Sequence, residues 1–331
     1  MFSNGSKVFL RKWMPLAISV LALVAVFSLA DLRAFRGLAS RMQWDRLPVI
    51  TLAVLGTVIA FGWRWRTLML EALSMQRAVV IAALGLGGNH ILPLRGGDAL
   101  RVVLSARGPQ APSIHAGVSA LALEKVLDLI AVAIFGLAST AALIAPEAEK
   151  NQISVVGVAL VILVVATAAL LSARSGLMIR AFRTLARATR LSPLLYRHLL
   201  RPLHHLRELS SPGRVVTLLI ETGVIWLVLY VIAYLAIAQL VGISLSIAEV
   251  MVLLFAAALG LAIPAAPSGI GTFHAAVVSA FVLLGKPASE GLVLAVAIHG
   301  IFFIGYCASG AAALAFASHQ LGPLRIRREI G

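Results

Sequence analysis

Charged residues and cysteines are scarce in this sequence. Asp, Glu, Lys and Arg make up 12% of the 331 residues, against about 25% in soluble globular domains, which excludes that class. The single cysteine, Cys307, excludes an internal disulfide. What replaces charge is apolar surface: 60% of the residues are hydrophobic, and the mean hydropathy is +0.99. The composition is that of a polytopic membrane protein.

Motifs for nucleotide, metal or acyl-transfer chemistry are also missing. The sequence contains no Walker loop, no HExxH, no paired-cysteine metal spacing and no GxSxG elbow. The adjacent His204 and His205 point to different faces of a helix, which does not suit a shared metal. We therefore expect no cofactor, no metal and no catalytic residue.

Apolar runs long enough to cross a bilayer core recur along the chain, since about 20 helical residues suffice. They predict an all-α membrane bundle forming one transmembrane domain over residues 1–331. The expected full spans are 13–30, 47–63, 117–144, 152–172, 215–241 and 291–317. The first run also has the basic flank of a signal peptide, but an arginine-rich stretch follows it directly, and we interpret it as a retained span.

The distribution of arginine predicts the topology. Residues 174–214 hold nine arginines and one acid, Glu208, which places this segment in the cytoplasm. Six spans then put both termini in the cytoplasm, in a bacterial inner membrane. Arg180, Arg183 and Arg187 are spaced as on one helix face, so the segment should lie on lipid headgroups; alternatively it docks a partner enzyme. The net charge of +15 thus indicates membrane lipids and no nucleic acid. Residues 31–46 are expected to form an interfacial helix.

Two apolar segments are interrupted where a helix would need to continue. The segment 78–107 breaks at "PLRGG" and the segment 250–285 breaks at "PAAPSGIG". Each is predicted to be a re-entrant hairpin whose break lies within protein or lines a watery cavity. On this topology the hairpins enter from opposite faces, and the cationic flank of the first includes Arg64. Such paired interruptions indicate a transporter site between inverted repeats.

The first break carries a polar cluster. Gly96 and Gly97, followed by Asp98, predict a helix start whose backbone N–H groups can meet an anion. Arg95 and Arg101 flank it and can bind phosphate; Asp98 can also pair with Arg101, three residues on. Alternatively, Asp98 caps the helix and the arginines reach the interface. Two further polar residues of the predicted site precede the break, Asn89 and His90.

The next span contains two acids on one helix face, Glu124 and Asp128. Asp128 would lie about 17 Å deep if the helix entered the core near Gly117. Carboxylates there need partners, for which Arg95 and Arg101 are the candidates, with Lys125 about 100° round the helix. The acids form either a salt-bridge lock or a substrate or proton path. Glu221 is expected to reach the cytoplasmic interface and is given no site.

The second break offers another glycine-rich helix entry, "PSGIGT". Its predicted anion-binding residues are Ser268, Gly269, Gly271 and Thr272. His274 follows one turn in, and His299 lies within the last span. Each histidine is either part of the substrate site or a hydrogen-bonded core residue.

Three ordered motifs resemble the lysylphosphatidylglycerol synthase transmembrane region family, also described as flippase-like. They are "LPLRGGDALR" (Leu92–Arg101), "EKVLD" (Glu124–Asp128) and "PAAPSGIGTFHAA" (Pro264–Ala276). The resemblance covers almost the whole chain. It implies a bundle with two re-entrant helices that handles or flips lipids, with Arg95, Asp98, Arg101, Glu124 and Asp128 at the matching polar positions. The soluble aminoacyl-transferase domain of the full-length synthases is absent, so lysyl transfer is not implied.

Three positions depart from the family pattern that this resemblance brings. The family commonly has Arg at Lys125, Glu at His274 and Arg about where His299 stands. If the latter two pair in relatives, His274 and His299 should face each other here.

The expected function is movement of an anionic or polyprenyl-linked lipid between leaflets. The alternatives are a lipid-modifying transferase with Asp98 or Glu124 as base, and a non-catalytic partner that presents lipid to a separate enzyme. The sequence does not predict the oligomeric state.

Overall fold

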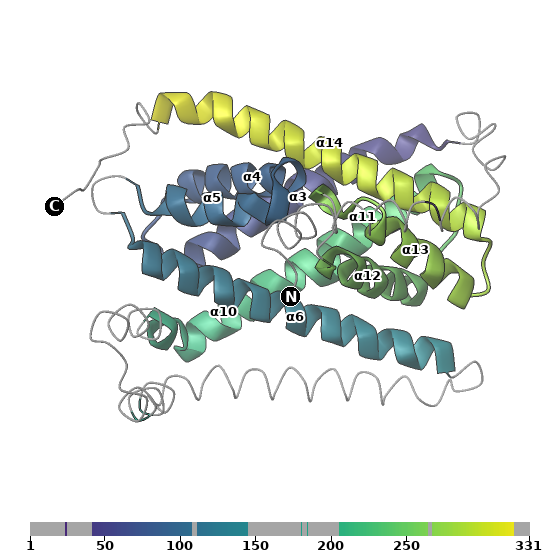
Figure 1. The fold of residues 1–331 in the computed structure, drawn as a ribbon, viewed down its shortest axis with the longest axis horizontal. Coiled ribbons are helices and arrows are strands. Elements are labelled where there is room, and N and C mark those ends of the chain that lie inside the picture. Colours follow the sequence, from purple (N-terminus) through teal and green to yellow (C-terminus); the bar gives the residue numbers. More distant parts are fainter. Residues whose placement is uncertain are drawn as a thin grey trace, which may run out of the picture.

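The computed structural model describes residues 42–107, 111–144, 205–263 and 267–320, together with the isolated Val24, Arg180 and Thr184. The expected spans 13–30 and 152–172, most of the interfacial helix at 31–46 and most of the basic segment 174–214 lie outside these residues. Within them the chain is helical and contains no strand (Figure 1).

Ten α or π segments and three short 3-10 turns make up the described chain. In order they are η2 (Trp44–Arg46), α3 (Leu47–Leu68), α4 (Met75–Ile91), η3 (Pro93–Arg95), α5 (Gly96–Ser105), α6 (Ile114–Ile144), α10 (Pro212–Gly223), η5 (Val224–Tyr230), α11 (Val231–Leu240), α12 (Ile247–Ala262), η6 (Pro267–Gly269), α13 (Thr272–Leu283) and α14 (Ala288–Gln320). Among the described helices, three are long and apolar enough to cross a membrane: Trp44–Leu68, Pro212–Leu240 and Ala288–Phe316. The predicted class, an all-α membrane bundle, is confirmed.

The helix ends differ from the predicted spans in one way that matters for the site. α6, α10 and α14 each begin three residues before the predicted start, a minor difference. α3, however, continues to Leu68, past the predicted end at residue 63. Arg64 therefore lies inside the helix, where its side chain is fully buried, and the prediction that it flanks the membrane on the cytoplasmic side is wrong.

Each interrupted segment folds into two packed helices joined by a short break. α4 ends at Ile91 and α5 begins at Gly96, while α12 ends at Ala262 and α13 begins at Thr272. In both hairpins the residue just before the second helix has a left-handed backbone, Arg95 with φ 55° and Gly271 with φ 93°. That each hairpin enters and leaves the membrane at one face stays a prediction.

Glycine allows the close approach of α4 and α5. A Cβ on Gly97 would overlap the carbonyl oxygen of Gly85 and the backbone nitrogen of Asn89. Gly260 plays the matching part in the second hairpin, where a Cβ would lie 2.7 Å from the carbonyl oxygen of Thr272.

The described chain divides into two sets of elements, each with a broken hairpin between longer helices. The first is α3, the α4–α5 hairpin and α6; the second is α10 to α11, the α12–α13 hairpin and α14. α4 packs against α14 and α12 packs against α6, so each hairpin's first helix contacts the last helix of the other set. Figure 1 shows the two hairpins on opposite sides of the molecule, with α4 and α5 at the left and α12 and α13 at the right. Their breaks are in contact, since η3 touches η6. Two inverted repeats would give this reciprocal pattern.

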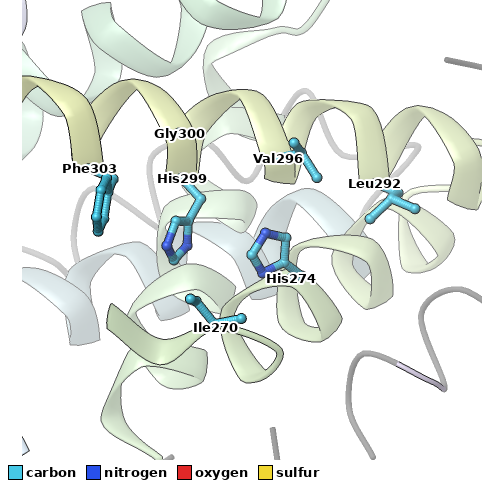
Figure 2. A pocket seen from close by; sticks show the side chains of 7 residues that line it. All are labelled: Ile270, His274, Leu292, Val296, His299, Gly300 and Phe303. Carbon is cyan, nitrogen blue, oxygen red and sulfur yellow. The ribbon is translucent and has the colours of Figure 1, made fainter. Parts of the chain in front are cut away.

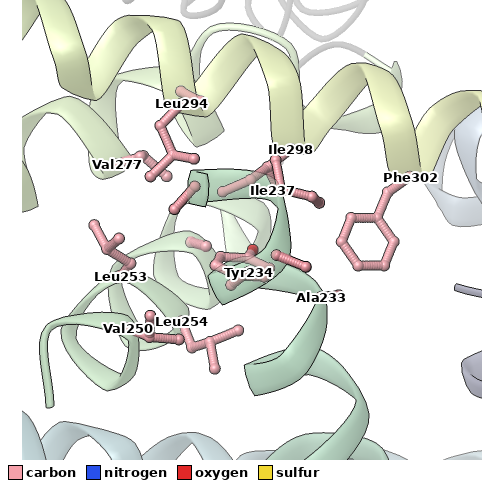
Figure 3. Packing of buried hydrophobic residues seen from close by; sticks show 14 of the residues in the cluster. Ala233, Tyr234, Ile237, Val250, Leu253, Leu254, Val277, Leu294, Ile298 and Phe302 are labelled. Carbon is pink, nitrogen blue, oxygen red and sulfur yellow. The ribbon is translucent and has the colours of Figure 1, made fainter. Parts of the chain in front are cut away.

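The largest buried apolar cluster joins the second set. Ile237 of α11, Leu253 of α12 and Val277 of α13 lie against Leu294 and Ile298 of α14, as Figure 3 shows. Because these side chains are buried, α14 packs along much of its length against three other helices. The second break, which lies between α12 and α13, is therefore next to a well-packed helix.

Candidate functional site

Arg101 of α5 is the centre of a buried ionic cluster. Its Nη1 and Nη2 donate to the two carboxylate oxygens of Glu124 at 2.9 and 2.6 Å, a bidentate pair, and Nη2 also donates to Asp98 Oδ1 at 2.8 Å. Arg101 is 2% exposed and Glu124 is fully buried. Of the two alternatives for Asp98, the pair with Arg101 is the one observed, and of the two candidate arginines it is Arg101 that binds Glu124. The pair with Glu124 joins α5 to α6.

Asp128 has a partner that the sequence did not indicate. Arg64 Nη1 of α3 lies 2.8 Å from Asp128 Oδ1, and its Nη2 lies 3.7 Å from Glu124 Oε2. The expectation that Arg95 or Arg101 would neutralise Asp128 is therefore wrong. The sequence held one indication of this partner. Two acids deep in a span need more than one buried cation to neutralise them.

Two further residues complete the cluster. Lys125 Nζ lies 3.0 Å from Asp98 Oδ2 and 3.5 Å from Glu124 Oε1, with 41% of its side chain exposed. Trp226 donates its indole N–H to Asp128 Oδ1 at 3.0 Å. Three cations thus face three carboxylates, a set we call the ionic cluster: Arg64, Arg101, Lys125, Asp98, Glu124 and Asp128.

The π-helix η5 places Trp226 and a second aromatic within this region. π segments in longer helices are rare and occur often at functional sites. Tyr230 at the end of η5 lies 3.3 Å from the hydroxyl of Tyr306, which in turn lies 3.0 Å from Thr57 Oγ1. This hydrogen-bonded chain links α3, η5 and α14, and no sequence pattern had indicated it.

Asn89 caps α5 from a different helix. Its Oδ1 accepts the backbone N–H of Asp98 at 3.0 Å, while its Nδ2 donates to Asp98 Oδ1 at 2.9 Å. Asp98 therefore does not cap the helix itself; it receives donors from Asn89, Arg101 and Lys125. The Asp98 N–H predicted to meet an anion is already used within the protein.

Arg95 stands apart from the ionic cluster. Its side chain is exposed at the first break, its backbone is left-handed, and no ion pair or hydrogen bond of its side chain is found within the described parts of the chain. Nearby, His90 Nδ1 lies 3.0 Å from the carbonyl of Leu86, and its ring packs edge-on against Phe303 and Tyr306. Arg95 is thus the cation of the predicted site that is open to a ligand.

The second break is held by hydrogen bonds of its own. Ser268, with φ 62°, places Oγ 3.1 Å from His299 Nε2 of α14. The backbone N–H of Gly271 donates to His274 Nδ1 at 3.4 Å, so that nitrogen carries no proton, and Thr272 Oγ1 donates to the carbonyl of Gly269 at 3.3 Å. The Gly271 donor expected to meet an anion is therefore used internally.

The two histidines face each other, as predicted. Their rings stack with centroids 4.9 Å apart and an interplanar angle of 25°. Figure 2 shows His274 projecting from α13 toward His299 on α14, beside a cavity of about 400 Å³. The cavity is lined by Ile270, His274, Leu292, Val296, His299, Gly300 and Phe303. Apart from the two imidazoles this lining is apolar.

The predicted site residues therefore fall into two groups. The first group is Asn89 with the ionic cluster around α3, α5 and α6, where most hydrogen-bonding groups are already paired with one another. The second group lies at the meeting point of the breaks, which we call the tip site: His90, Arg95, Ser268, Gly269, Gly271, Thr272, His274 and His299. Phe303 connects its parts, since it contacts His90 and lines the cavity.

Metal binding finds no support in the described residues, which hold no group of three His, Cys, Asp or Glu side chains suited to an ion.

Comparison with known proteins identifies the family of this chain from its sequence. The pattern of the family described as "Lysylphosphatidylglycerol synthase TM region" matches residues 12–310. No curated protein and no solved structure matches the chain. Residues 12–310 include both breaks and the ionic cluster, so the match spans every part of the site. The chain belongs to the lysylphosphatidylglycerol synthase TM region family and is a multi-pass membrane protein associated with membrane lipids.

Proposed function

We propose that this protein moves an anionic or polyprenyl-linked lipid between the two leaflets of a bacterial inner membrane. The observation that carries the proposal is the meeting of the two broken hairpins, which approach from opposite ends of the molecule and touch beside a cavity. Broken helices in inverted sets are the usual framework of alternating-access sites.

The tip site suits an amphipathic ligand. Arg95 offers an unpaired guanidinium that can bind a phosphate with two parallel hydrogen bonds. The cavity beside His299 offers apolar walls for the first part of a chain. Arg101, in contrast, would have to give up Glu124 before it could bind a headgroup. We therefore assign headgroup contact to Arg95, and to the ionic cluster the task of holding α3, α5 and α6 together.

The polar contacts that hold the two hairpins differ in strength. α5 is bound to α6 by the buried pair of Arg101 and Glu124, whereas the second break is bound to α14 by the neutral contact of Ser268 with His299 and by ring stacking. Charge-assisted hydrogen bonds are roughly twice as strong as neutral ones. The break of the second hairpin, rather than its packed helices α12 and α13, is therefore the part that opens first in the proposed cycle.

Proteoliposomes test this proposal. The parent protein is reconstituted with headgroup-labelled phosphatidylglycerol or a polyprenyl phosphate, and exposure of the label to an added quencher is followed over time. We expect the parent to exchange the label between leaflets and Arg95→Ala to do so at least roughly tenfold more slowly, because each hydrogen bond to a charged group contributes about 1.5–3 kcal/mol. Arg46→Ala is the matched control, because Arg46 pairs with Asp45 on the surface at the start of α3.

Exchange by the parent no faster than in protein-free liposomes for either lipid would contradict transport. An Arg95→Ala rate equal to that of the parent would contradict the assignment of headgroup contact to Arg95. The recovered lipid is weighed by mass spectrometry, since a change in its mass would instead support the transferase alternative. Co-purification of an enzyme with a protein that moves no lipid would support the lipid-presenting alternative.

A further inference from the structure

Glu221 of α10 is a buried acid outside the ionic cluster. The sequence suggested that it reaches the interface, but its residue is only 1% exposed, so that expectation is wrong. Its Oε1 accepts a hydrogen bond from Thr67 Oγ1 of α3 at 2.6 Å. Its Oε2 is buried and has no hydrogen-bond partner within the described residues.

The cations near Glu221 are already in use. Arg64 is bound to Asp128 and lies near Glu124, and its Nη1 also donates to Thr222, the residue after Glu221. The charge of one further acid, Glu71 in the turn after α3, reaches Glu221. The carboxylate of Glu71 lies 3.9 Å from the guanidinium of Arg66. Within the described residues no ion pair reaches Glu221.

Charge balance then decides the state of this acid. The ionic cluster contains three cations and three carboxylates and is neutral without Glu221. An ionised Glu221 would add one uncompensated negative charge to a buried site, which is far more costly than a neutral carboxyl with one unsatisfied hydroxyl. A proton on Oε2 removes that charge and leaves the bond from Thr67 intact.

Arg64 has unused hydrogen-bond donors that match the unused oxygen of Glu221. Its Nε and Nη2 are buried and lack hydrogen-bond partners, as Glu221 Oε2 does. When Glu221 is neutral, Arg64 stays with Asp128 on α6. When Glu221 loses its proton, the unused donors of Arg64 have a new carboxylate on α10 to bind, and the hold of α3 on α6 weakens.

We infer that Glu221 is a proton-binding site that determines whether Arg64 bonds to Asp128 or to Glu221. The inference goes beyond lipid transport and does not depend on it, because occupancy of the site by a proton can be observed in protein that moves nothing. If transport is also found, the same exchange of Arg64 would link proton release to the movement of α6.

Infrared spectroscopy of the purified protein in detergent at neutral pH tests the inference. A protonated carboxyl has a carbonyl stretching band that ionised carboxylates lack. We expect this band in the parent and its loss in Glu221→Gln. The matched control is Glu290→Gln, which removes an exposed acid in the first turn of α14 and should leave the band unchanged.

Two further variants keep the test decisive if Glu221→Gln fails to fold. Thr67→Val removes the donor to the carbonyl oxygen and should shift the band to higher frequency without removing it. Asp128→Asn frees Arg64 and leaves one excess positive charge, so Glu221 should ionise and the band should disappear. The inference is overturned if the parent shows no band, if the band persists in Glu221→Gln, or if it is unmoved in Thr67→Val or undiminished in Asp128→Asn.

Discussion

Arg64 Nη1 and Asp128 Oδ1 lie 2.8 Å apart and join two helices through residues 64 positions apart in the chain. The pair gives α6 a buried partner for an acid that would otherwise face lipid or an empty space. It also connects the ionic cluster to α10, because Arg64 Nη1 donates to Thr222 as well. The side chain of Arg64 is thus the point at which α3, α6 and α10 meet.

Arg64→Ala should destabilise the protein strongly. It leaves Asp128 without its cation and reduces the neutralisation of Glu124, and removal of one partner from a buried pair costs about 3–5 kcal/mol. Chemical unfolding in mild detergent, followed by circular dichroism, measures the change. Arg46→Ala should cost less than about 1 kcal/mol, because its pair with Asp45 is largely exposed. Equal losses in the two variants would show that the buried pair is not structural.

Gly97→Ala should prevent the first hairpin from closing properly. The added methyl group would overlap the carbonyl of Gly85 and the backbone of Asn89, neither of which can move like a side-chain end. Overpacking of this kind costs about 1–3 kcal/mol or more. Gly213→Ala is the matched control, since a Cβ there meets no atom within 4 Å. The thermal midpoint in detergent should fall for the first variant and not for the second; an unchanged Gly97→Ala midpoint would refute the close packing of α4 and α5.

Trp226→Phe separates a hydrogen bond from ring packing. The indole donates to the Asp128 carboxylate and its ring lies 5.2 Å from that of Tyr230. Phenylalanine keeps most of the packing and loses the donor, so the free energy of unfolding should fall by about 1.5–3 kcal/mol. In Trp63→Phe, an exposed site on α3, it should change little. Matching effects at the two positions would mean that the indole N–H does not support Asp128.

Ser268→Gly tests the weaker polar contact at the second break. Glycine accepts the left-handed backbone at this position, and the variant loses the hydroxyl that contacts His299. We expect faster lipid exchange in proteoliposomes with stability changed by no more than about 1 kcal/mol. The control is Ser309→Ala, which removes a hydroxyl that donates to the carbonyl of Gly305 within the same helix and should leave the rate unchanged. Alanine is used there because glycine would weaken the continuous helix α14. A slower Ser268→Gly variant would show that this contact is needed to hold the lipid.

The sequence predicted the parts of the site that depend on local spacing. Asp98 and Arg101 are three residues apart on a helix, so their pairing follows from helical geometry. The breaks follow from prolines and glycines that cluster inside an apolar run, where proline removes a backbone donor and ends the helix. The pair of His274 and His299 was expected through the family resemblance, because nothing local connects positions 25 residues apart.

What the sequence did not predict depends on packing between distant helices. Arg64 follows the apolar run of α3 by one residue and looked like a membrane flank, yet α3 extends further and turns this side chain into the core. Glu221 looked able to reach water, but α3 covers it with Thr67. Asn89 caps a helix other than its own, a contact that no capping pattern within α5 reveals. The π-helix has no sequence signature at all.

We propose that the tip site holds the headgroup of a membrane lipid through Arg95. Mass spectrometry of the lipids that co-purify with the protein in mild detergent tests it most directly, with the parent, Arg95→Ala and Arg46→Ala prepared in parallel. We predict one lipid class with an anionic headgroup, enriched in the parent and in Arg46→Ala and lost in Arg95→Ala. Absence of any enriched class, or enrichment that persists in Arg95→Ala, would contradict the claim.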